Sequence, residues 1–276
     1  MGRGSSKSGG GASGGGLGLG GGSTRGIAGT GGALPQITNS VIPPTPQQVA
    51  SGNVLPAGGV AFSDFSSMTD DEKADVINDA LSTGVPMFLD DSGLQRFAYY
   101  TGMSDKPTIV SDAQLDQISG KSLYRTVNDV YDRSKDIGYT SGDIIKQISE
   151  GDFTMYSDSG GSAYGKGIYF ADSYTDSSWY GNSGKNPKTM RAKVTSGKSI
   201  SATTLSQDFR KAYNRGDKLA LACAKADSAS QENLYALAKG YSVVTDNWSG
   251  YTVVLNRGAL TVSSTAKKTN IGGTDW

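Results

Sequence analysis

A chain of 276 residues carries 26 basic and 26 acidic side chains, one cysteine and no histidine. The absence of histidine excludes Ser-His-Asp hydrolases, Cys-His proteases and histidine-ligated metal sites. The formal net charge is zero, which gives no reason to expect a protein that coats nucleic acid. A single cysteine can form neither an internal disulfide nor a cysteine-based zinc site. Any chemistry must therefore come from carboxylates, Arg, Lys, Tyr, Ser and a bound cofactor.

Glycine and serine dominate residues 1–35, which have little apolar surface to bury and a high backbone entropy, so we predict disorder there. Arg3, Lys7 and Arg25 make this segment mildly basic, so contact with nucleic acid or another subunit is an alternative to a plain flexible tether. Residues 36–60 contain "IPPTPQQ" and indicate an extended linker, because Pro-Pro suits neither a helix nor a central strand. No apolar run reaches the roughly 20 residues of a membrane span, and the N-terminus lacks a signal-peptide core. We therefore expect a cytoplasmic protein without a membrane partner or a metal.

Three short helices are predicted between residues 61 and 119. Thr69 stands three residues before Glu72, which is the arrangement of a capping box, and apolar residues follow at helical spacing in "MTDDEKADVINDALSTG". "DSGLQRFAYYTGM" predicts a second helix that ends at Gly102, and "SDAQLDQIS" a third with Ser111 as its N-cap. We expect these helices to form an N-terminal helical lobe.

Strands interleaved with helices are predicted after the lobe. The expected strands are "KSLYRTV", "KGIYFAD" and "TMRAKVT", followed by a hairpin of strands at 241–245 and 251–256 and a further strand at 259–263. The expected helices are "YTSGDIIKQISEG", "LSQDFRKAYNRG" and "DSASQENLYALAKG", the last ending at Gly240. Cys223 lies in "LALACAKA", an apolar helical run, and is interpreted as a buried small hydrophobe rather than a nucleophile.

The order of elements predicts an α+β fold without a regular βαβ repeat, with a small N-terminal helical lobe before a sheet and its flanking helices. The expected organisation is a head and linker at 1–60, the lobe at 61–119, a sheet domain at 120–263 and a polar tail at 264–276. The tail, "SSTAKKTNIGGTDW", is predicted to be disordered.

The stretch "YGKGIYFADSYTDSSWYG", residues 164–181, is the most informative of the chain. Taken singly, a Gly-x-Gly before a strand is usually a tight turn, and a strand aromatic is usually a core residue. The combination resembles the nicotinamide-binding segment of the ADP-ribosyltransferase superfamily, most closely that of the poly(ADP-ribose) polymerases and the diphtheria-toxin-like enzymes. In that group one tyrosine lies on a Gly-x-Gly-Ile-Tyr-Phe-Ala strand and a second on the following helix, as Y-x10-Y. Tyr169 and Tyr180 match this spacing.

The nicotinamide of NAD is a flat cationic ring that binds well between two aromatic faces. The resemblance therefore implies NAD as the substrate, with Tyr169 and Tyr180 stacking on nicotinamide and Gly167 bringing the backbone close to the carboxamide. It also implies a split β-sheet with flanking helices over residues 120–263.

Upstream, "SLYRTV" resembles the strand that opens the sheet in the Leu-Tyr-Arg branch of the superfamily. This match implies cofactor contacts for Arg125 and its neighbour Thr126, with Arg125 either binding the phosphates of NAD or bracing the site. Arginine suits phosphate because its planar fork donates two hydrogen bonds and keeps its charge. A surface arginine on a strand is the alternative.

Downstream, the superfamily places a catalytic glutamate at the start of a late strand. Its carboxylate holds the ribose 2′-hydroxyl and stabilises the positive charge that develops as nicotinamide leaves. In "SGYTVVLNRGAL", Gly250 occupies that position. Asp246 in the hairpin loop and Glu232 in the preceding helix are candidate replacements, and a solvated surface charge or a helix cap is the alternative for each.

Three functions remain open. The first is an NAD-dependent mono-ADP-ribosyltransferase that acts on a protein or nucleic-acid acceptor, with Arg125, Asp246 and Glu232 as catalytic residues. The second is a catalytically inactive adaptor in a virion, since bacteriophages carry members of the superfamily as structural or injected components. The Gly-rich head, the Pro-containing linker and the polar tail suit such an assembly protein. The third is an NAD glycohydrolase, which uses the same site with water as the acceptor.

Overall fold

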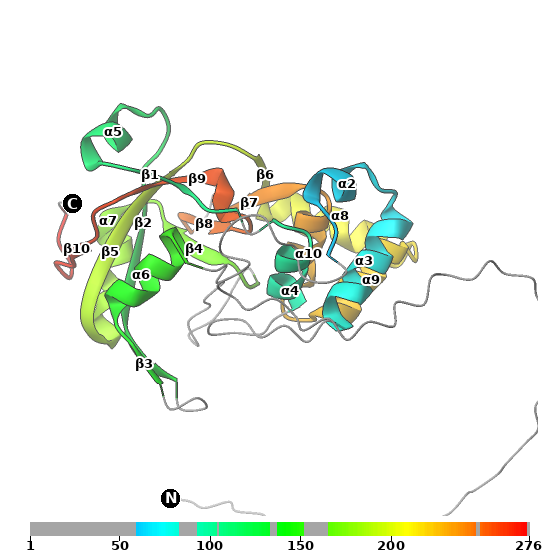
Figure 1. Ribbon diagram of the computed structural model, residues 1–276, viewed down its shortest axis with the longest axis horizontal. Helices are drawn as coiled ribbons and strands as arrows, with labels where there is room; N and C mark the ends of the chain where they lie inside the picture. Colours follow the sequence, from blue (N-terminus) through cyan, green and yellow to red (C-terminus); the bar gives the residue numbers. More distant parts are fainter. Residues whose placement is uncertain are drawn as a thin grey trace, which may run out of the picture. The chain divides into compact units, whose positions relative to one another are not determined.

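The computed structural model describes residues 59–82, 93–103, 105–132, 137–151, 165–246 and 249–274. The head and linker predicted for residues 1–60 lie outside these ranges except for Gly59 and Val60, and so does Tyr164 of the tyrosine motif. All described residues belong to one compact unit of the chain, Val41–Trp276. The fold is α+β, with helices flanking an open sheet, as the order of elements predicts (Figure 1).

Each helix predicted from a capping pattern forms, and the caps fix where these helices begin. The Thr69 N–H donates to Glu72 Oε2 at 2.7 Å, and the Glu72 N–H donates to Thr69 Oγ1 at 3.3 Å. Ser111 and Thr140 begin later helices through the same reciprocal arrangement. The helices are α2 (Phe62–Ser67), α3 (Asp70–Ser82), α4 (Gly93–Tyr100), α5 (Asp112–Gln117), α6 (Ser141–Ser149), α7 (Tyr174–Trp179), α8 (Ala202–Asn214), α9 (Lys218–Ala226) and α10 (Gln231–Ala238), with 3-10 turns η1 (Tyr180–Ser183) and η2 (Arg257–Ala259).

The capping box of α3 gives a direct stability test. The substitution Thr69→Ala is expected to lower the free energy of unfolding by about 1 kcal/mol, because the Glu72 N–H loses its side-chain acceptor and the Glu72 carboxylate loses the hydrogen bond from the Thr69 hydroxyl. Urea unfolding followed by circular dichroism measures this loss. Thr69→Ser keeps the hydroxyl and should restore most of the stability, and equal losses in the two variants would contradict a capping role.

The sheet joins strands that lie far apart in the sequence. Its order is β1-β9-β5-β2-β4-β8-β7-β6, with β10 added to β5 and β3 to β2. Neighbours along this order run antiparallel except for two parallel pairs, β1 with β9 and β6 with β7. The strands are β1 (Thr108–Val110), β2 (Leu123–Asp132), β3 (Ile137–Tyr139), β4 (Ile168–Ala171), β5 (Lys185–Val194), β6 (Lys198–Ser201), β7 (Tyr241–Thr245), β8 (Tyr251–Val254), β9 (Leu260–Ser263) and β10 (Lys267–Lys268).

The sheet is nearly divided between β2 and β4. Their ladder within the described residues consists of one pair, Tyr124 with Ala171, whereas each strand pairs more fully with its other neighbour. Just beyond that pair, Arg125 Nη1 donates to the Tyr169 carbonyl oxygen at 2.8 Å. The guanidinium therefore bridges the two strands where their ladder ends.

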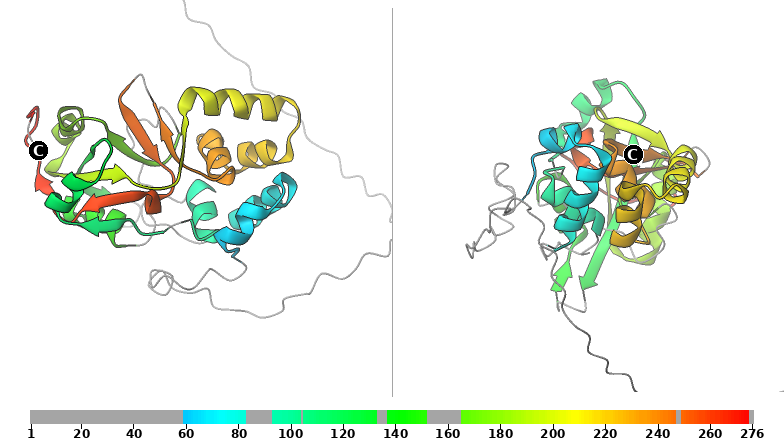
Figure 2. Two further views of the ribbon diagram at one scale, coloured as in Figure 1. Left: turned by 90° about the horizontal axis from the view of Figure 1, so that it is seen from above. Right: turned by 90° about the vertical axis from the view of Figure 1, so that its right-hand side faces the viewer.

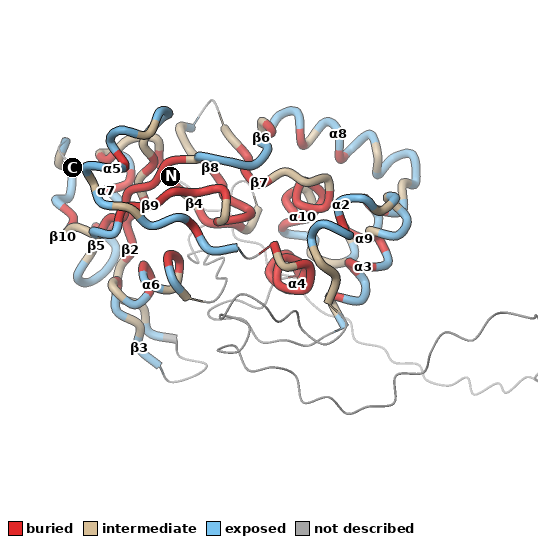
Figure 3. Tube along the Cα trace, turned by 45° about the horizontal axis from the view of Figure 1, so that its top comes forward, coloured by how far each residue is buried: buried red, intermediate tan, exposed pale blue. Residues whose placement is uncertain are grey.

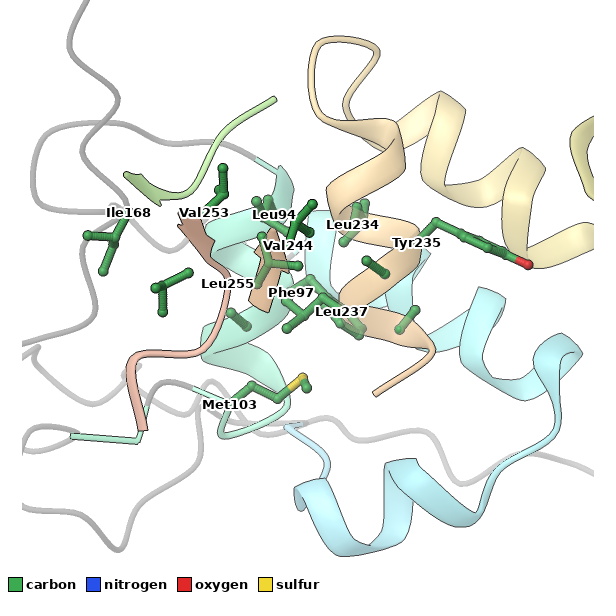
Figure 4. Close-up of a cluster of buried hydrophobic side chains, with 14 of the residues drawn as sticks. Leu94, Phe97, Met103, Ile168, Leu234, Tyr235, Leu237, Val244, Val253 and Leu255 are labelled. Carbon is green, nitrogen blue, oxygen red and sulfur yellow. The ribbon is translucent and has the colours of Figure 1, made fainter. Parts of the chain in front are cut away.

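The core lies between the sheet and two buried helices. Figure 3 shows α4 and α10 as largely buried, whereas α8 exposes most of its length. Helix α3 packs along α9, and α4 packs against α10, so helices from both halves of the chain share this core (Figure 2). None of the helices in the described ranges is long and apolar enough to cross a membrane. The cluster in Figure 4 includes Leu94, Phe97, Met103, Leu234, Leu237, Val244, Val253 and Leu255.

The third predicted helix, α5, does not join α2–α4 in the N-terminal lobe. Strand β1 precedes it and pairs with β9, which carries α5 to the sheet. Arg191 Nη1 of β5 donates to Asp116 Oδ1 at 2.7 Å, and Lys193 Nζ donates to the Ile118 carbonyl at 2.5 Å. The prediction of one three-helix lobe is therefore corrected, because a short parallel pairing and two cations of β5 hold α5 elsewhere.

The polar segment after β9 forms regular structure, contrary to the predicted disorder. Strand β10 pairs with β5, with Lys267 opposite Thr189. Further on, the Asn270 N–H donates to the Tyr174 hydroxyl of α7 at 2.8 Å. The segment is polar, but its backbone and hydroxyl groups form hydrogen bonds with β5 and α7. Composition alone cannot predict these partners, because they lie elsewhere in the chain.

Candidate functional site

The turn at residues 165–167, which leads into β4, is fixed against the start of α10. The Lys166 N–H donates to Ser230 Oγ at 2.8 Å, and Asn233 Nδ2 donates to the Lys166 carbonyl at 2.8 Å. Gly165 has a φ of 77°, a conformation that residues with a side chain rarely adopt. The glycine and these two hydrogen bonds set the direction in which β4 leaves the turn.

Strand register places the first tyrosine and a candidate carboxylate on one face of the sheet. Tyr169 lies opposite Val253 of β8, which lies opposite Val244 of β7. The Asp246 N–H donates to the Tyr251 carbonyl at 3.0 Å, which continues the same hairpin by one more pair. Side chains of directly opposed residues share a face, and this face recurs at every second residue. Tyr169, Tyr251 and Asp246 therefore belong to one face, called here the tyrosine face.

Tyr251 contacts Tyr180 and shares the tyrosine face with Tyr169. Tyr180 begins η1 directly after α7 and is 49% exposed. Its hydroxyl donates to the Tyr251 hydroxyl at 2.8 Å, and the two rings meet edge to face with centroids 6.2 Å apart. Tyr169 is half-buried, and its hydroxyl donates to the Gly165 carbonyl. Burial raises the pKa of Tyr251, and its hydrogen bond with Tyr180 raises it further, so this hydroxyl stays protonated at neutral pH.

Buried hydroxyls hold α7, and with it Tyr180, against the sheet. The Thr126 hydroxyl of β2 shares hydrogen bonds with Ser177 of α7 at 3.0 Å and with Thr189 of β5 at 2.7 Å. The Thr189 hydroxyl continues to Thr269 at 2.8 Å. Thr126, which the resemblance assigns to the cofactor, is therefore engaged in positioning α7.

Arg125 is buried, with 9% of its surface exposed. Its neighbours Tyr124 and Thr126 contact α7, so strand alternation directs Arg125 to the opposite face. Its hydrogen bond to the Tyr169 carbonyl corresponds to the bracing role, one of the two roles that the sequence suggests. Tyr124 pairs with Ala171, which lies on the tyrosine face, so Arg125 lies on the opposite side of the sheet.

A pocket of about 700 Å³ lies beside the turn at 165–167. Gly165, Glu232 and Asp246 all line it, so the structure brings both candidate carboxylates to the turn that precedes Tyr169. The exposed helix α8 forms another wall. Its contribution includes Thr203, Ser206, Gln207 and Arg210.

The two carboxylates are held differently. Glu232 Oε1 accepts a hydrogen bond from Ser206 Oγ at 3.0 Å, while its other oxygen accepts none from the residues that the structure describes. Asp246 Oδ2 accepts from the Ser249 N–H at 3.0 Å and also from the Ser249 hydroxyl. Glu232 is thus oriented with one oxygen available to a ligand, whereas Asp246 also stabilises the hairpin loop.

Two glycines of the motifs have structural reasons to be glycine. Gly250, at the position where a catalytic glutamate was expected, has a φ of 72°, in which a glutamate would be strained. The neighbouring Asp172 donates its N–H to the Gly250 carbonyl at 2.8 Å and pairs its carboxylate with Lys121 at 2.6 Å. At Gly167 a Cβ would lie 2.4 Å from Val253 Cγ1, so this glycine makes room for the core.

Sequence reasoning missed Ser206, Arg210 and Tyr251. Ser206 and Arg210 are four residues apart in "LSQDFRKAYNRG", one helical turn, so a predicted helix there could have placed them on one face. Arg210 is exposed and, among the described residues, has no ion-pair partner.

No group of three or more Cys, Asp and Glu side chains in the described part of the chain is arranged to hold a metal ion. Cys223 is fully buried, as predicted, and burial raises the pKa of its thiol, which keeps it protonated and unreactive. Comparison of the chain with protein-family models, with curated proteins and with solved structures finds no match in any of the three.

Proposed function

We propose that the chain binds NAD at the pocket beside residues 165–167 and is an NAD-dependent mono-ADP-ribosyltransferase for a protein or nucleic-acid acceptor. One observation carries the proposal: the turn that leads into the tyrosine strand and the two candidate carboxylates line the same pocket. Glu232 and Asp246 reach it from α10 and from the end of β7. Strand register also puts Asp246 and Tyr169 on one face.

The size and chemical character of the pocket support a dinucleotide. Its volume of about 700 Å³ lies within the range of cofactor and drug-sized sites. The carboxylates can stabilise the positive charge that develops on the ribose of NAD, and the Arg210 guanidinium suits a phosphate. Tyr180 offers an exposed ring outside the pocket lining, where a flat cationic ring can stack.

The reaction breaks the bond between ribose C1′ and the nicotinamide nitrogen. Nicotinamide leaves as a neutral molecule with the bonding electron pair, and the acceptor bonds to C1′ and gives up its proton. Positive charge therefore develops on the ribose, where a fixed carboxylate stabilises it. Glu232 is the residue proposed for this role, with Ser206 as its positioning residue.

One observation favours a second candidate, an NAD-binding adaptor without turnover. The late strand begins with Gly250 in a conformation that a glutamate would adopt only with strain. Neither replacement carboxylate lies within that strand, because Glu232 is in α10 and Asp246 follows β7. An adaptor of this kind would bind NAD and release no nicotinamide.

Replacing Tyr180 by alanine is expected to weaken NAD binding by roughly three- to tenfold, because the nicotinamide ring loses one aromatic face. Half of Tyr180 is exposed, so the substitution leaves the core intact. Isothermal titration calorimetry with NAD measures the affinity, and chromatography of the same sample measures released nicotinamide and ADP-ribose.

Two variants control this experiment. Tyr180→Phe keeps the ring and should retain most of the affinity. Tyr213→Ala removes another exposed tyrosine, which packs on Phe209 of α8 rather than on Tyr251, and should change nothing. Absence of saturable binding by the unaltered protein would overturn the proposal. Binding without release of nicotinamide supports the adaptor, and free ADP-ribose as the sole product supports the glycohydrolase.

A further inference from the structure

A second pocket, of about 580 Å³, lies on the other flank of α8. Leu205 lines both pockets, so α8 forms the wall between them. Tyr235 of α10 and Tyr241 of β7 supply aromatic rings to this second pocket, and charged side chains from α8 to α10 surround them. Neither candidate carboxylate of the proposed NAD site lines it.

Tyr235 presents an unused hydroxyl to this pocket. The residue is 7% exposed, and its ring packs edge to face on Phe209 with centroids 5.5 Å apart. Figure 4 shows its hydroxyl end directed away from the core cluster. Within the described residues this hydroxyl has no hydrogen-bond partner, and its oxygen is not among the fully buried atoms, so it is open to a ligand in the pocket.

Three cations surround the pocket. Lys211 and Arg215 lie one turn apart at the end of α8, and neither has an ion-pair partner among the residues that the structure describes. Lys239 Nζ lies 5.6 Å from the centroid of the Tyr235 ring and pairs with Asp70 at 2.5 Å. Burial lowers the pKa of Lys239, but the hydrogen bond to Asp70 and neighbouring charges outweigh burial and leave it above its usual value.

Two carboxylates also line the pocket and reduce its net positive charge. Asp217 Oδ1 accepts a hydrogen bond from the Ala220 N–H at 3.0 Å as the N-cap of α9, so its charge is used within the fold. Asp208 is exposed on α8. The guanidinium of Arg215, the ammonium of Lys211 and the hydroxyl of Tyr235 remain as hydrogen-bond donors that the described residues do not engage.

We propose that this second pocket binds the phosphate group of a small ligand. Arg215 and Lys211 supply charge-assisted hydrogen bonds to phosphate oxygens, and Tyr235 adds a neutral donor from the buried side. Burial raises the pKa of Tyr235, so its hydroxyl keeps the proton that it would donate. The phosphate belongs either to inorganic phosphate or to a nucleotide, whose base the rings of Tyr235 and Tyr241 could contact.

Calorimetric titration of the full chain in a phosphate-free chloride buffer tests the site, with inorganic phosphate, adenosine 5′-monophosphate and adenosine as probes. Tyr235→Phe removes the hydroxyl and keeps the packed ring, and Arg215→Gln removes a charge at an exposed position. Each substitution is expected to weaken phosphate binding by about tenfold. Lys146→Gln, an exposed cation on α6, should leave the affinity unchanged.

Glu232→Gln, in the first pocket, should bind phosphate like the unaltered chain, which separates this proposal from that of NAD binding. Tighter binding of the monophosphate than of inorganic phosphate, with no binding of adenosine, identifies a nucleotide as the ligand class. Equal affinity for the two identifies the free anion. The proposal is overturned if the unaltered chain shows no saturable binding of either probe, or if Tyr235→Phe and Arg215→Gln bind them as tightly as it does.

Discussion

Replacing Glu232 by glutamine is expected to lower the rate of nicotinamide release from NAD by about 100- to 1,000-fold. Glutamine keeps the size of the side chain and can still contact Ser206, but it has no negative charge to stabilise the ribose as the glycosidic bond breaks. Affinity for NAD should change little, because the lost interaction strengthens only as charge develops. Single-turnover measurement of nicotinamide, together with calorimetric NAD binding, separates the two effects.

Asp246→Asn is expected to reduce the rate by a smaller factor, roughly tenfold, because Asp246 is already tied to Ser249 in the hairpin loop. Glu150→Gln changes an exposed carboxylate just after α6 and should leave the rate unaltered. If Glu232→Gln binds NAD and releases nicotinamide as fast as the unaltered chain, Glu232 is not the catalytic carboxylate.

The second large effect concerns stability. Arg257→Met is expected to lower the free energy of unfolding by about 3 to 5 kcal/mol. Arg257 is 1% exposed, and its guanidinium donates to the carbonyls of Gln147 at 2.8 Å, Ile148 at 3.1 Å and Gly151 at 2.7 Å. These carbonyls lie at the end of α6, where helical carbonyls lack partners within the helix. Methionine fills part of the space and leaves the carbonyls buried without those donors.

Chemical denaturation followed by circular dichroism measures the loss. If the free energy of unfolding depends on denaturant concentration with the same slope in both proteins, unfolding exposes the same amount of surface in both. Lys185→Met removes an exposed cation from β5 and should shift the free energy of unfolding by less than about 0.5 kcal/mol. A loss below about 1 kcal/mol for Arg257→Met would show that the α6 carbonyls find other partners and that the arginine does not hold the helix.

Local chemistry made much of the fold predictable. Thr69, Ser111 and Thr140 each carry a reciprocal cap whose partners lie three residues away, so the sequence alone contains both halves of the interaction. Gly102 and Gly240 end their helices with positive φ, as glycines after a helical pattern often do. The short strands β1 and β10 were missed because their stability comes from partners elsewhere in the chain, on β9 and β5.

The candidate site was predictable in part. The order of strand, tyrosine and following helix identified Tyr169 and Tyr180, and Glu232 and Asp246 were chosen as the nearest carboxylates to an expected glutamate. Nothing in the sequence indicated that α8 would form a wall of their pocket or that Tyr251 would meet Tyr180. The face to which Arg125 points depends on which neighbours α7 contacts, and this is a property of tertiary packing rather than of the Leu-Tyr-Arg motif.

The contacts between α7 and the segment after β10 have a consequence for the order of folding during synthesis. Thr175 donates to the carbonyl of Gly273, a residue 98 positions downstream. A ribosome adds about 5 to 20 residues per second, so α7 emerges several seconds before this partner exists. Until then α7 lacks the hydrogen bond between the Tyr174 hydroxyl and the Asn270 N–H, and Thr189 lacks its partner Thr269. The helix that precedes Tyr180 is therefore held by only some of its final contacts. The Tyr180 ring should therefore reach its final position only after Gly273 has been synthesised, later than the pairing of the strands that precede it in the chain.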